Sequence, residues 1–301
     1  MTTLQTNNLK GVMFNLSSML LFTIMDILVK KLVVELPVYE VIFFRCLTGI
    51  PFFIVFAYYT AGLSSLKIVN IKFQFARAIF GVIGMFFFFN AYKYLPLADA
   101  GAILFSAPLI LTVLSVLFLK EKIGIHRTTA IIIGFIGVLF IARPGGQGMS
   151  AYMLLPLVGA FCWSFVVIIM RVLSRTDHPN GVTLVFSLIG TLTAGVLVIY
   201  NGGFSDNITG IQMLMLVVCG IVGIFAQCLM MIAVKWAEAS VFGSTKYLSL
   251  VFAILAGYFV FDETPAFYTF VGIFLIILSG LYNVWREYVL AKEQRIKTLR
   301  Y

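Results

Sequence analysis

The sequence predicts an all-α membrane protein whose ten transmembrane helices form two inverted five-helix repeats. Three observations lead to this prediction. Hydrophobic residues occupy 61% of the 301 positions and charged residues 11%, whereas soluble domains have about 45 to 50% and about 25%. The apolar residues form ten long segments, and Lys and Arg are abundant in every second connection between them. Each half contains five of these segments, and an odd number is what an inverted repeat requires.

Each apolar segment is predicted to be a helix. Backbone groups in hydrocarbon must find their hydrogen bonds within the segment, and the period-two alternation of a β-barrel is absent. About 20 apolar residues cross a hydrocarbon core of roughly 30 Å. In chain order the predicted spans are 11–30, 38–60, 74–94, 97–119, 126–143, 151–173, 180–200, 210–234, 238–261 and 265–285.

The basic residues predict the orientation. With the N-terminus on side one, 15 of the 21 Lys and Arg residues belong to side one, including Arg77, and 4 to side two, including Lys30. Only Arg45 and Lys246 remain inside the predicted spans. The positive-inside rule then places both termini in the cytoplasm. The net charge of +9 is spread over short loops and a tail, which favours contact with lipid headgroups over nucleic acid.

No residue pattern points to catalysis or a cofactor. The four cysteines lie inside apolar segments without zinc-type spacing. His126 and His178 fall in or near loops, which does not support a metal site or a Ser-His triad within the membrane, and no nucleotide-binding P-loop is present. We therefore expect neither an enzyme nor an ATP-driven pump. A channel stays open as an alternative, although no filter-like loop is evident.

The second half of the sequence resembles the first. An offset of 142 residues relates Ala91 to Ala233, Lys93 to Lys235, Gly101 to Gly243 and Glu121 to Glu263 without a gap. Each half contains five predicted spans, and an odd number forces two copies to insert with opposite orientations. This is the architecture of many secondary transporters. Chance similarity between apolar segments is the alternative, which the matching positions of the two Glu residues disfavour.

Two stretches carry a resemblance to a known family. They are PLADAGAILFSAPLILTVLSVLFLKEK at 96–122 and ASVFGSTKYLSLVFAILAGYFVFDETP at 239–265, followed by SGLYNVWRE at 279–287. In these residues the chain resembles the drug/metabolite transporter superfamily, in particular its EamA-like ten-helix carriers. The runs EVIFFR at 40–45 and KYL at 246–248 are similar to riboflavin and S-adenosylmethionine carriers of that family.

The resemblance implies a multi-pass carrier of the bacterial inner membrane that works by alternating access. It implies one repeat over residues 1–145, a second over 146–288 and a basic cytoplasmic tail over 289–301, with a cavity lined mainly by spans 1, 3, 4, 6, 8 and 9. The favoured function is uptake of a vitamin-like or nucleoside-like solute such as riboflavin or S-adenosylmethionine. Export of amino acids or other small metabolites is the alternative. A monomer or a loosely associated dimer is expected.

Three ionisable residues inside spans are the first candidates for the substrate site, because a charge at mid-membrane costs about 2.5 to 3.5 kcal/mol on insertion scales. Asp26 and Arg45 are predicted at roughly 6 and 10 Å below the same interface, which favours an ion pair with either a structural or a substrate-binding role. Lys246, about 12 Å from the other side, has Leu104 as its counterpart in the first half. Contact with an anionic or carbonyl-bearing substrate is favoured over snorkelling.

Six further residues combine an apolar body with a hydrogen-bonding group on spans expected to line the cavity. They suit a planar heteroaromatic or amphipathic substrate, with lipid-facing packing as the alternative. They are Asn90, Tyr92, Trp163, Gln227, Trp236 and Tyr247. Glu121 and Glu263 are predicted to act mainly as interfacial anchors or partners for basic groups, with proton coupling as the alternative, and Asp99 mainly as a helix cap.

Overall fold

The structure is a computed structural model that describes residues 8–107, 109–111, 113–114, 125–142, 151–173, 176–236 and 248–298. These residues form helices joined by short connections, with no strand among them. The first half contains α1 (Asn8–Glu35), α2 (Val38–Ala61), the short 3-10 helix η1 (Leu63–Leu66), α3 (Ile71–Tyr94), α4 (Leu97–Leu104) and α6 (Ile125–Ala142). The second contains η2 (Ala151–Met153), α7 (Leu154–Leu173), α8 (Pro179–Tyr200), α9 (Gly210–Trp236), α11 (Leu248–Phe261) and α12 (Phe267–Thr298).

The all-helical prediction is confirmed for the described residues. Six helices there are long and apolar enough to cross a membrane, and they correspond to α1, α2, α3, α7, α8 and α9. Four shorter apolar helical stretches match the other predicted spans. The number of ten transmembrane helices therefore remains a prediction.

Proline residues determine where several helices begin. Pro37 and Pro96 precede α2 and α4 with extended ψ angles of 139° and 147°, because a residue at the N-cap has left the helical conformation. Pro179 is the first residue of α8, where its missing N–H costs no helical hydrogen bond. The His178 side chain caps this helix by accepting a hydrogen bond from the Asn180 N–H at 3.2 Å.

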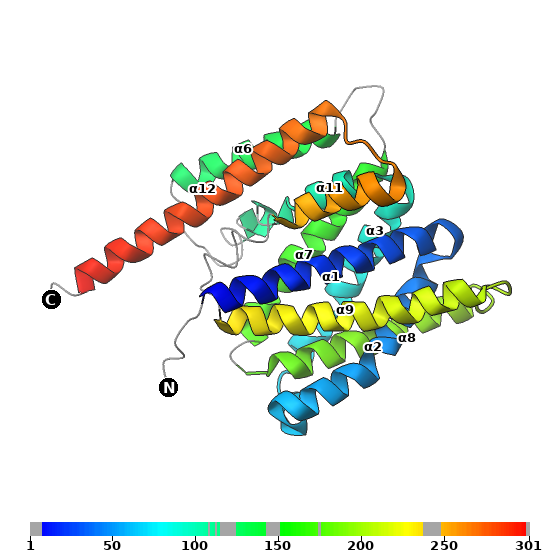
Figure 1. The fold of residues 1–301 in the computed structure, drawn as a ribbon. Coiled ribbons are helices and arrows are strands. Elements are labelled where there is room, and N and C mark those ends of the chain that lie inside the picture. The colour runs from blue at the N-terminus through cyan, green and yellow to red at the C-terminus, as the bar shows by residue number, and fades with distance from the viewer. Residues whose placement is uncertain are drawn as a thin grey trace.

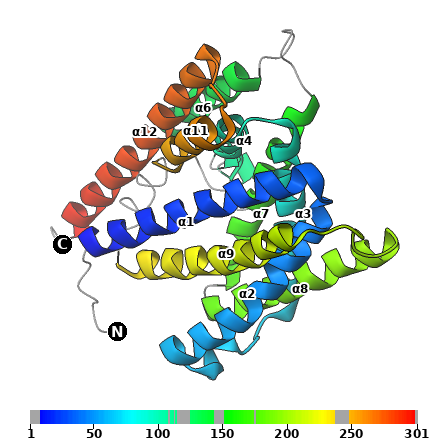
Figure 2. The ribbon, with the colours of Figure 1, turned by 45° about the vertical axis from the view of Figure 1, so that its right-hand side comes forward.

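The helices of the two halves pack against one another in a crossed pattern. Helix α1 packs along α9, and α3 along α7, whereas α2 packs on α8, α4 on α11 and α6 on α12. In two views related by a 45° rotation, α6 and α12 lie side by side on one flank and α2 and α8 on the opposite flank (Figures 1 and 2). Helices α1 and α9 run side by side between these flanks.

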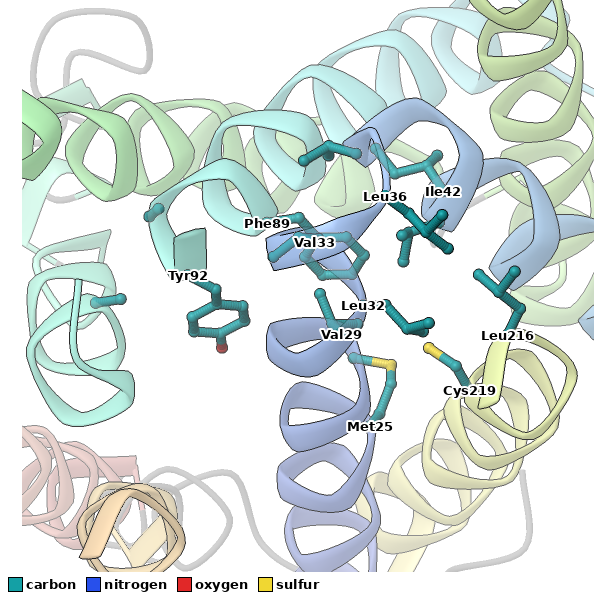
Figure 3. Close-up of a cluster of buried hydrophobic side chains, with 14 of the residues drawn as sticks. Met25, Val29, Leu32, Val33, Leu36, Ile42, Phe89, Tyr92, Leu216 and Cys219 are labelled. Carbon is teal, nitrogen blue, oxygen red and sulfur yellow. The ribbon is translucent and has the colours of Figure 1, made fainter. Parts of the chain in front are cut away.

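The largest buried apolar cluster lies where α1, α2, α3 and α9 meet (Figure 3). Val29 and Val33 of α1 are fully buried, as are Val41 of α2 and Leu216 and Cys219 of α9. These side chains come from helices that are distant in sequence. Their packing fixes the position of α1 between the two halves.

Helices also approach closely at glycine residues. A Cβ atom added at Gly272 of α12 would lie 2.5 Å from the Gly137 carbonyl oxygen of α6, and one added at Gly137 would lie 2.7 Å from the Gly272 oxygen. Lipid tails are as apolar as the helices, so membrane helices associate through close backbone packing more than through the hydrophobic effect. Glycine at both positions permits this contact.

Two basic residues that the sequence assigned to loops are buried inside helices. Lys30 belongs to α1, which continues five residues beyond the predicted end, and Arg77 is the seventh residue of α3. Each exposes 7% of its surface. Helix α1 continues because Leu32, Val33 and Leu36 pack in the core, and Arg77 lies against α8. The assignment of these two charges to the two sides of the membrane stays a prediction.

Asp177 connects the α7–α8 turn to the start of α3. Its carboxylate accepts hydrogen bonds from the Val69 N–H at 2.9 Å, the Asn70 N–H at 3.2 Å, the Thr176 hydroxyl at 2.7 Å and the Gln74 amide. Burial opposes ionisation of this carboxyl group, but the four donors outweigh it and lower the pKa of Asp177 below its ordinary value. The charge therefore stabilises the folded chain.

We predict that Gly272→Ala destabilises the protein. The new methyl group would overlap the Gly137 oxygen, and forcing two packed helices apart typically costs about 1 to 3 kcal/mol. The thermal unfolding midpoint of the purified protein in detergent measures the effect. Gly101→Ala is the matched control, since its Cβ would meet Ala253 Cβ at an ordinary 3.9 Å. Equal midpoints for the two variants would contradict the predicted overlap.

Asp177 is also predicted to make stability depend on acid pH. A folded-state pKa below the ordinary value of 3.8 means that the stabilisation is present above that value and is lost as the pH falls through the lowered pKa. The unfolding midpoint of the wild type should fall on acidification below about pH 5. Asp177→Asn should start lower at neutral pH and change less, whereas the exposed control Asp206→Asn should follow the wild type. An unchanged slope in Asp177→Asn would exclude this origin.

Candidate functional site

A carboxyl group lies at mid-depth on α1. Asp26 is half-buried and lies nine residues before the end of α1, or about 13 Å along the axis. The Tyr92 hydroxyl of α3 is its hydrogen-bonding partner. The Tyr92 ring is 2% exposed and packs on Phe88 and Phe89 at centroid distances of 4.8 and 6.5 Å. The aromatic packing therefore holds the hydroxyl group in position for the carboxylate.

A guanidinium group from α2 lies beside this pair. Arg45 is half-buried, and its contacts are to sulfur atoms and an aromatic ring. Its Nε lies 3.4 Å from Met25 Sδ, its Nη1 lies 3.1 Å from Met85 Sδ, and its Cζ lies 5.9 Å from the Phe89 ring centroid. Thioether sulfur is a weak acceptor. Among the described residues, the partners of Arg45 Nε and Nη1 are thus soft sulfur atoms.

The predicted direct ion pair between Asp26 and Arg45 is wrong. Both residues are described, and no ion pair joins them, although their charges interact electrostatically. Consecutive residues of an α-helix point about 100° apart. Arg45 contacts Met25 and thus the neighbouring face of α1, while Asp26 points to Tyr92. Figure 3 labels Met25 on α1 and Tyr92 on α3 as separate parts of this region.

Two predicted polar residues lie near this group without joining it. The Asn90 amide donates a hydrogen bond to the Phe86 oxygen one turn earlier, at 2.8 Å. Gln227 is half-buried on α9, one turn beyond Gly223, where an added Cβ would lie 3.7 Å from Arg45 Nε. A turn of helix is about 5.4 Å long. Gln227 therefore lies at a neighbouring level of the bundle.

The other predicted site residues lie elsewhere or outside the described residues. Trp163 of α7 is 40% exposed. Trp236 ends α9 and lies under the Lys10 ammonium, with Nζ 5.4 Å from the ring centroid, so it marks the end of the bundle. Lys246 and Tyr247 lie outside the described residues, as does Glu121.

A second charged group lies one turn after Asp26, toward the C-terminal end of α1. Lys30 Nζ forms an ion pair with Glu263 and donates a hydrogen bond to the Leu95 oxygen at 2.9 Å. The other carboxylate oxygen of Glu263 accepts from the Leu97 N–H at 2.9 Å. These contacts join α1 to the α3–α4 corner and to the residues after α11. The interpretation of Glu263 as a partner for a basic group is confirmed.

Asp99 has a partner on another helix. Its Oδ1 accepts a hydrogen bond from the Thr269 hydroxyl of α12 at 2.9 Å. The residue lies in the first turn of α4, where the helix dipole favours a carboxylate. It therefore connects α4 to α12 in addition to its predicted role at the helix start.

Sequence reasoning missed the apolar neighbours of Arg45. Met25, Met85 and Phe89 surround the guanidinium group, and Gly223 allows α9 to approach it. The position of Met25 next to Asp26 was the available signal, but spacing does not reveal which of two adjacent residues faces α2. A carboxylate and a guanidinium group that are close but unpaired retain hydrogen-bonding capacity for a polar solute.

Comparisons with known proteins agree with this architecture. A solved crystal structure superimposes with a TM-score of 0.66 at 20% identity, covering 94% of this chain and 99% of that chain. This likeness shows the fold alone. The sequence is 28% identical to a riboflavin transporter of Vibrio cholerae over 77% of each chain.

Two further relatives cover more of the chain. A pseudopaline exporter of Pseudomonas aeruginosa is 26% identical over 89% of this chain and 94% of its own length. An S-adenosylmethionine uptake transporter of Rickettsia bellii is 26% identical over 87% and 89%. The model of the EamA-like transporter family matches residues 9–143 and, separately, residues 150–285. The chain is therefore a multi-pass membrane protein that belongs to the EamA-like transporter family of the drug/metabolite transporter superfamily.

Proposed function

We propose that this protein is a secondary carrier that takes up a small organic metabolite by alternating access. The observation that carries the proposal is the unpaired arrangement of Asp26 and Arg45 at mid-depth, where α1, α2 and α3 meet. Ionisable groups at that depth are costly and generally serve substrate or ion binding. Tyr92 orients the carboxylate, and Met25, Met85 and Phe89 provide an apolar surface for the body of a solute.

The crossed packing supports two inverted five-helix repeats, over residues 1–145 and 146–288. The first helix of each half packs on the third helix of the other half, as α1 does on α9 and α7 on α3. Second helices pair with each other, as do fifth helices. A two-fold relation in the membrane plane produces this exchange, and rocking of one repeat against the other exposes a central site to each side in turn.

Riboflavin and S-adenosylmethionine are the first solutes to test, because relatives carry the names of transporters for them. Both combine a flat heteroaromatic ring system with polar groups, which suits a site of aromatic and thioether side chains beside two charges. Export of a small metabolite is the second candidate function. It is supported by the exporter that matches 89% of this chain.

The charge distribution supports an inner-membrane location with both termini in the cytoplasm, because 15 of the 21 Lys and Arg residues belong to one side of the predicted topology and 4 to the other. The proposal assigns residues 289–301 to a basic cytoplasmic tail. A monomer or a loosely associated dimer is expected to be the working unit.

Transport by purified protein in proteoliposomes tests the carrier function. Labelled riboflavin or S-adenosylmethionine should enter vesicles with a saturable rate and should exchange with unlabelled solute inside. A channel would instead give flux that rises in proportion to concentration without accelerated exchange. If the labelled solute enters the vesicles only when a gradient of another solute opposes its movement, the exporter is favoured.

Tyr92→Phe is predicted to lower saturable transport by about tenfold while leaving the unfolding midpoint nearly unchanged. It removes a hydrogen bond to a charged group, which is typically worth about 1.5 to 3 kcal/mol, but keeps the packed ring. Tyr94→Phe is the matched control on the same helix, because Tyr94 stacks on Tyr152 at a centroid distance of 3.7 Å. Asp26→Asn should abolish transport. Full activity of Asp26→Asn would reject this site.

A further inference from the structure

The ion pair between Lys30 and Glu263 is bonded on every side by neighbouring groups. Lys30 is 7% exposed. Its ammonium group binds Glu263 Oε1, donates a hydrogen bond to the Leu95 oxygen at 2.9 Å and lies 5.0 Å from the Phe261 ring centroid. Glu263 Oε2 accepts a hydrogen bond from the Leu97 N–H at 2.9 Å. The pair therefore joins three segments of the chain, namely α1, the α3–α4 corner and the residues after α11.

The backbone after α11 holds the Glu263 carboxylate in place. Asp262 follows the last residue of this helix with a φ of 53°, a left-handed conformation that Asp tolerates. The Glu263 N–H then donates to the Gly257 oxygen at 3.0 Å. A Cβ atom on Gly257 would lie 3.3 Å from Glu263 Oε2, so glycine leaves room for the carboxylate. The turn thus keeps the carboxylate against α11, where Lys30 reaches it.

The ion pair lies one turn away from the proposed substrate site. Lys30 follows Asp26 by four residues, so both lie on the same face of α1, about 6 Å apart along its axis. The hydrogen-bonding partner of Asp26 is Tyr92 of α3, and the carbonyl group that binds Lys30 belongs to Leu95, three residues later. The ion pair therefore lies between the site and the end of the bundle where α1 ends.

The ion pair also joins the two halves of the chain. Lys30, Leu95 and Leu97 belong to the first half and Glu263 to the second. Helix α1 packs on α11, and it lies between α11 and α9 in both views (Figures 1 and 2). Rocking of one half against the other opens a central site to one side at a time. Opening between α1 and α11 would separate Lys30 from Glu263.

Water makes two states of this ion pair favourable. In a closed seam of low dielectric constant a lone ammonium or carboxylate is costly, so each charge needs the other. When the seam opens to water, hydration replaces the lost partner. A seam that is too wide for the contact and too narrow for water satisfies neither charge. The pair is thus suited to a closed, dry state and an open, hydrated one.

We propose that Lys30 and Glu263 form the gate of the substrate site on the side where α1 ends, which is the extracytoplasmic side in the predicted topology. In the structure this gate is closed, and the site opens to that side when the ion pair separates. The inference rests on the proposed carrier function and adds its gating residues. It concerns access to the site and holds for any transported solute.

Chemical labelling of a cysteine beyond the gate tests the inference. Phe22 is half-buried and lies one turn before Asp26 on the same face of α1. Phe22→Cys is introduced into the full-length protein after its four buried cysteines are replaced by alanine. Sealed vesicles that expose the end of α1 are treated with a membrane-impermeant maleimide. Lys30→Met and Glu263→Met should each raise the labelling rate at least about tenfold, because only the open state hydrates the charge left behind.

Combining Lys30→Met with Glu263→Met gives the decisive comparison. The double variant leaves no lone charge in the closed seam, so its labelling rate should return close to the wild-type rate. Lys31→Met is the matched control, because it removes an ammonium group from the next, exposed position of α1, and it should label like the wild type. Unchanged labelling in both single variants overturns the gate, as does a double variant that labels as fast as the single ones.

If neither single variant folds, the exchanged pair Lys30→Glu with Glu263→Lys decides. It keeps opposite charges but turns a carboxylate toward the Leu95 oxygen and an ammonium group toward the Leu97 N–H, which weakens the closed state. Its labelling rate should exceed those of the wild type and of the double variant. A rate equal to that of the wild type overturns the gate.

Labelling separates this inference from the carrier proposal, because it needs no transported solute. Saturable transport together with labelling that does not depend on Lys30 and Glu263 rejects the gate and leaves the carrier intact. Labelling that follows the expected order without transport of any tested solute rejects the tested substrates and leaves the gate intact.

Discussion

Charge in a low-dielectric bundle is the constraint on which the interior of this protein depends. A buried ion must be paired, saturated with hydrogen bonds or left for a ligand. Lys30 meets the first condition through Glu263, and Asp177, at the edge of the bundle, meets the second through four donors. Arg45 and Arg77 meet neither within the described residues. This difference separates the charges that are bonded between helices from the charges that are not.

Packing within the bundle uses a different principle from that of soluble proteins. Apolar surface gains little by leaving lipid, so the contacts between halves rely on close backbone approach and on interhelical hydrogen bonds. Gly137 and Gly272 bring α6 and α12 together, and the Ser18 hydroxyl donates to the Ala226 oxygen between α1 and α9 at 2.7 Å. Polar groups are thus placed at the crossings, where two helices provide partners for them.

The two halves differ in charge at the crossings of their helices. Helix α2 packs beside α9, and the related helices of the other pair, α8 and α3, also pack together. Arg45 lies on α2 and Arg77 lies on α3. The positions equivalent to Arg45 and Arg77 in the second half are Ser187 and Cys219, so the two halves differ in charge at these crossings.

The sequence by itself determined the helical class and most helix bounds. Apolar length predicted a span at 38–60, and the structure has α2 at Val38–Ala61. The pairing role of Glu263 was also predictable from its place at a span end. Only the tertiary structure decided that Arg45 faces Met25 and Met85 instead of Asp26, and that Arg77 is buried against Phe186. The physical reason is that sequence spacing gives distance along a helix axis, whereas the face that a side chain presents, and the neighbour that covers it, follow from how the helices pack.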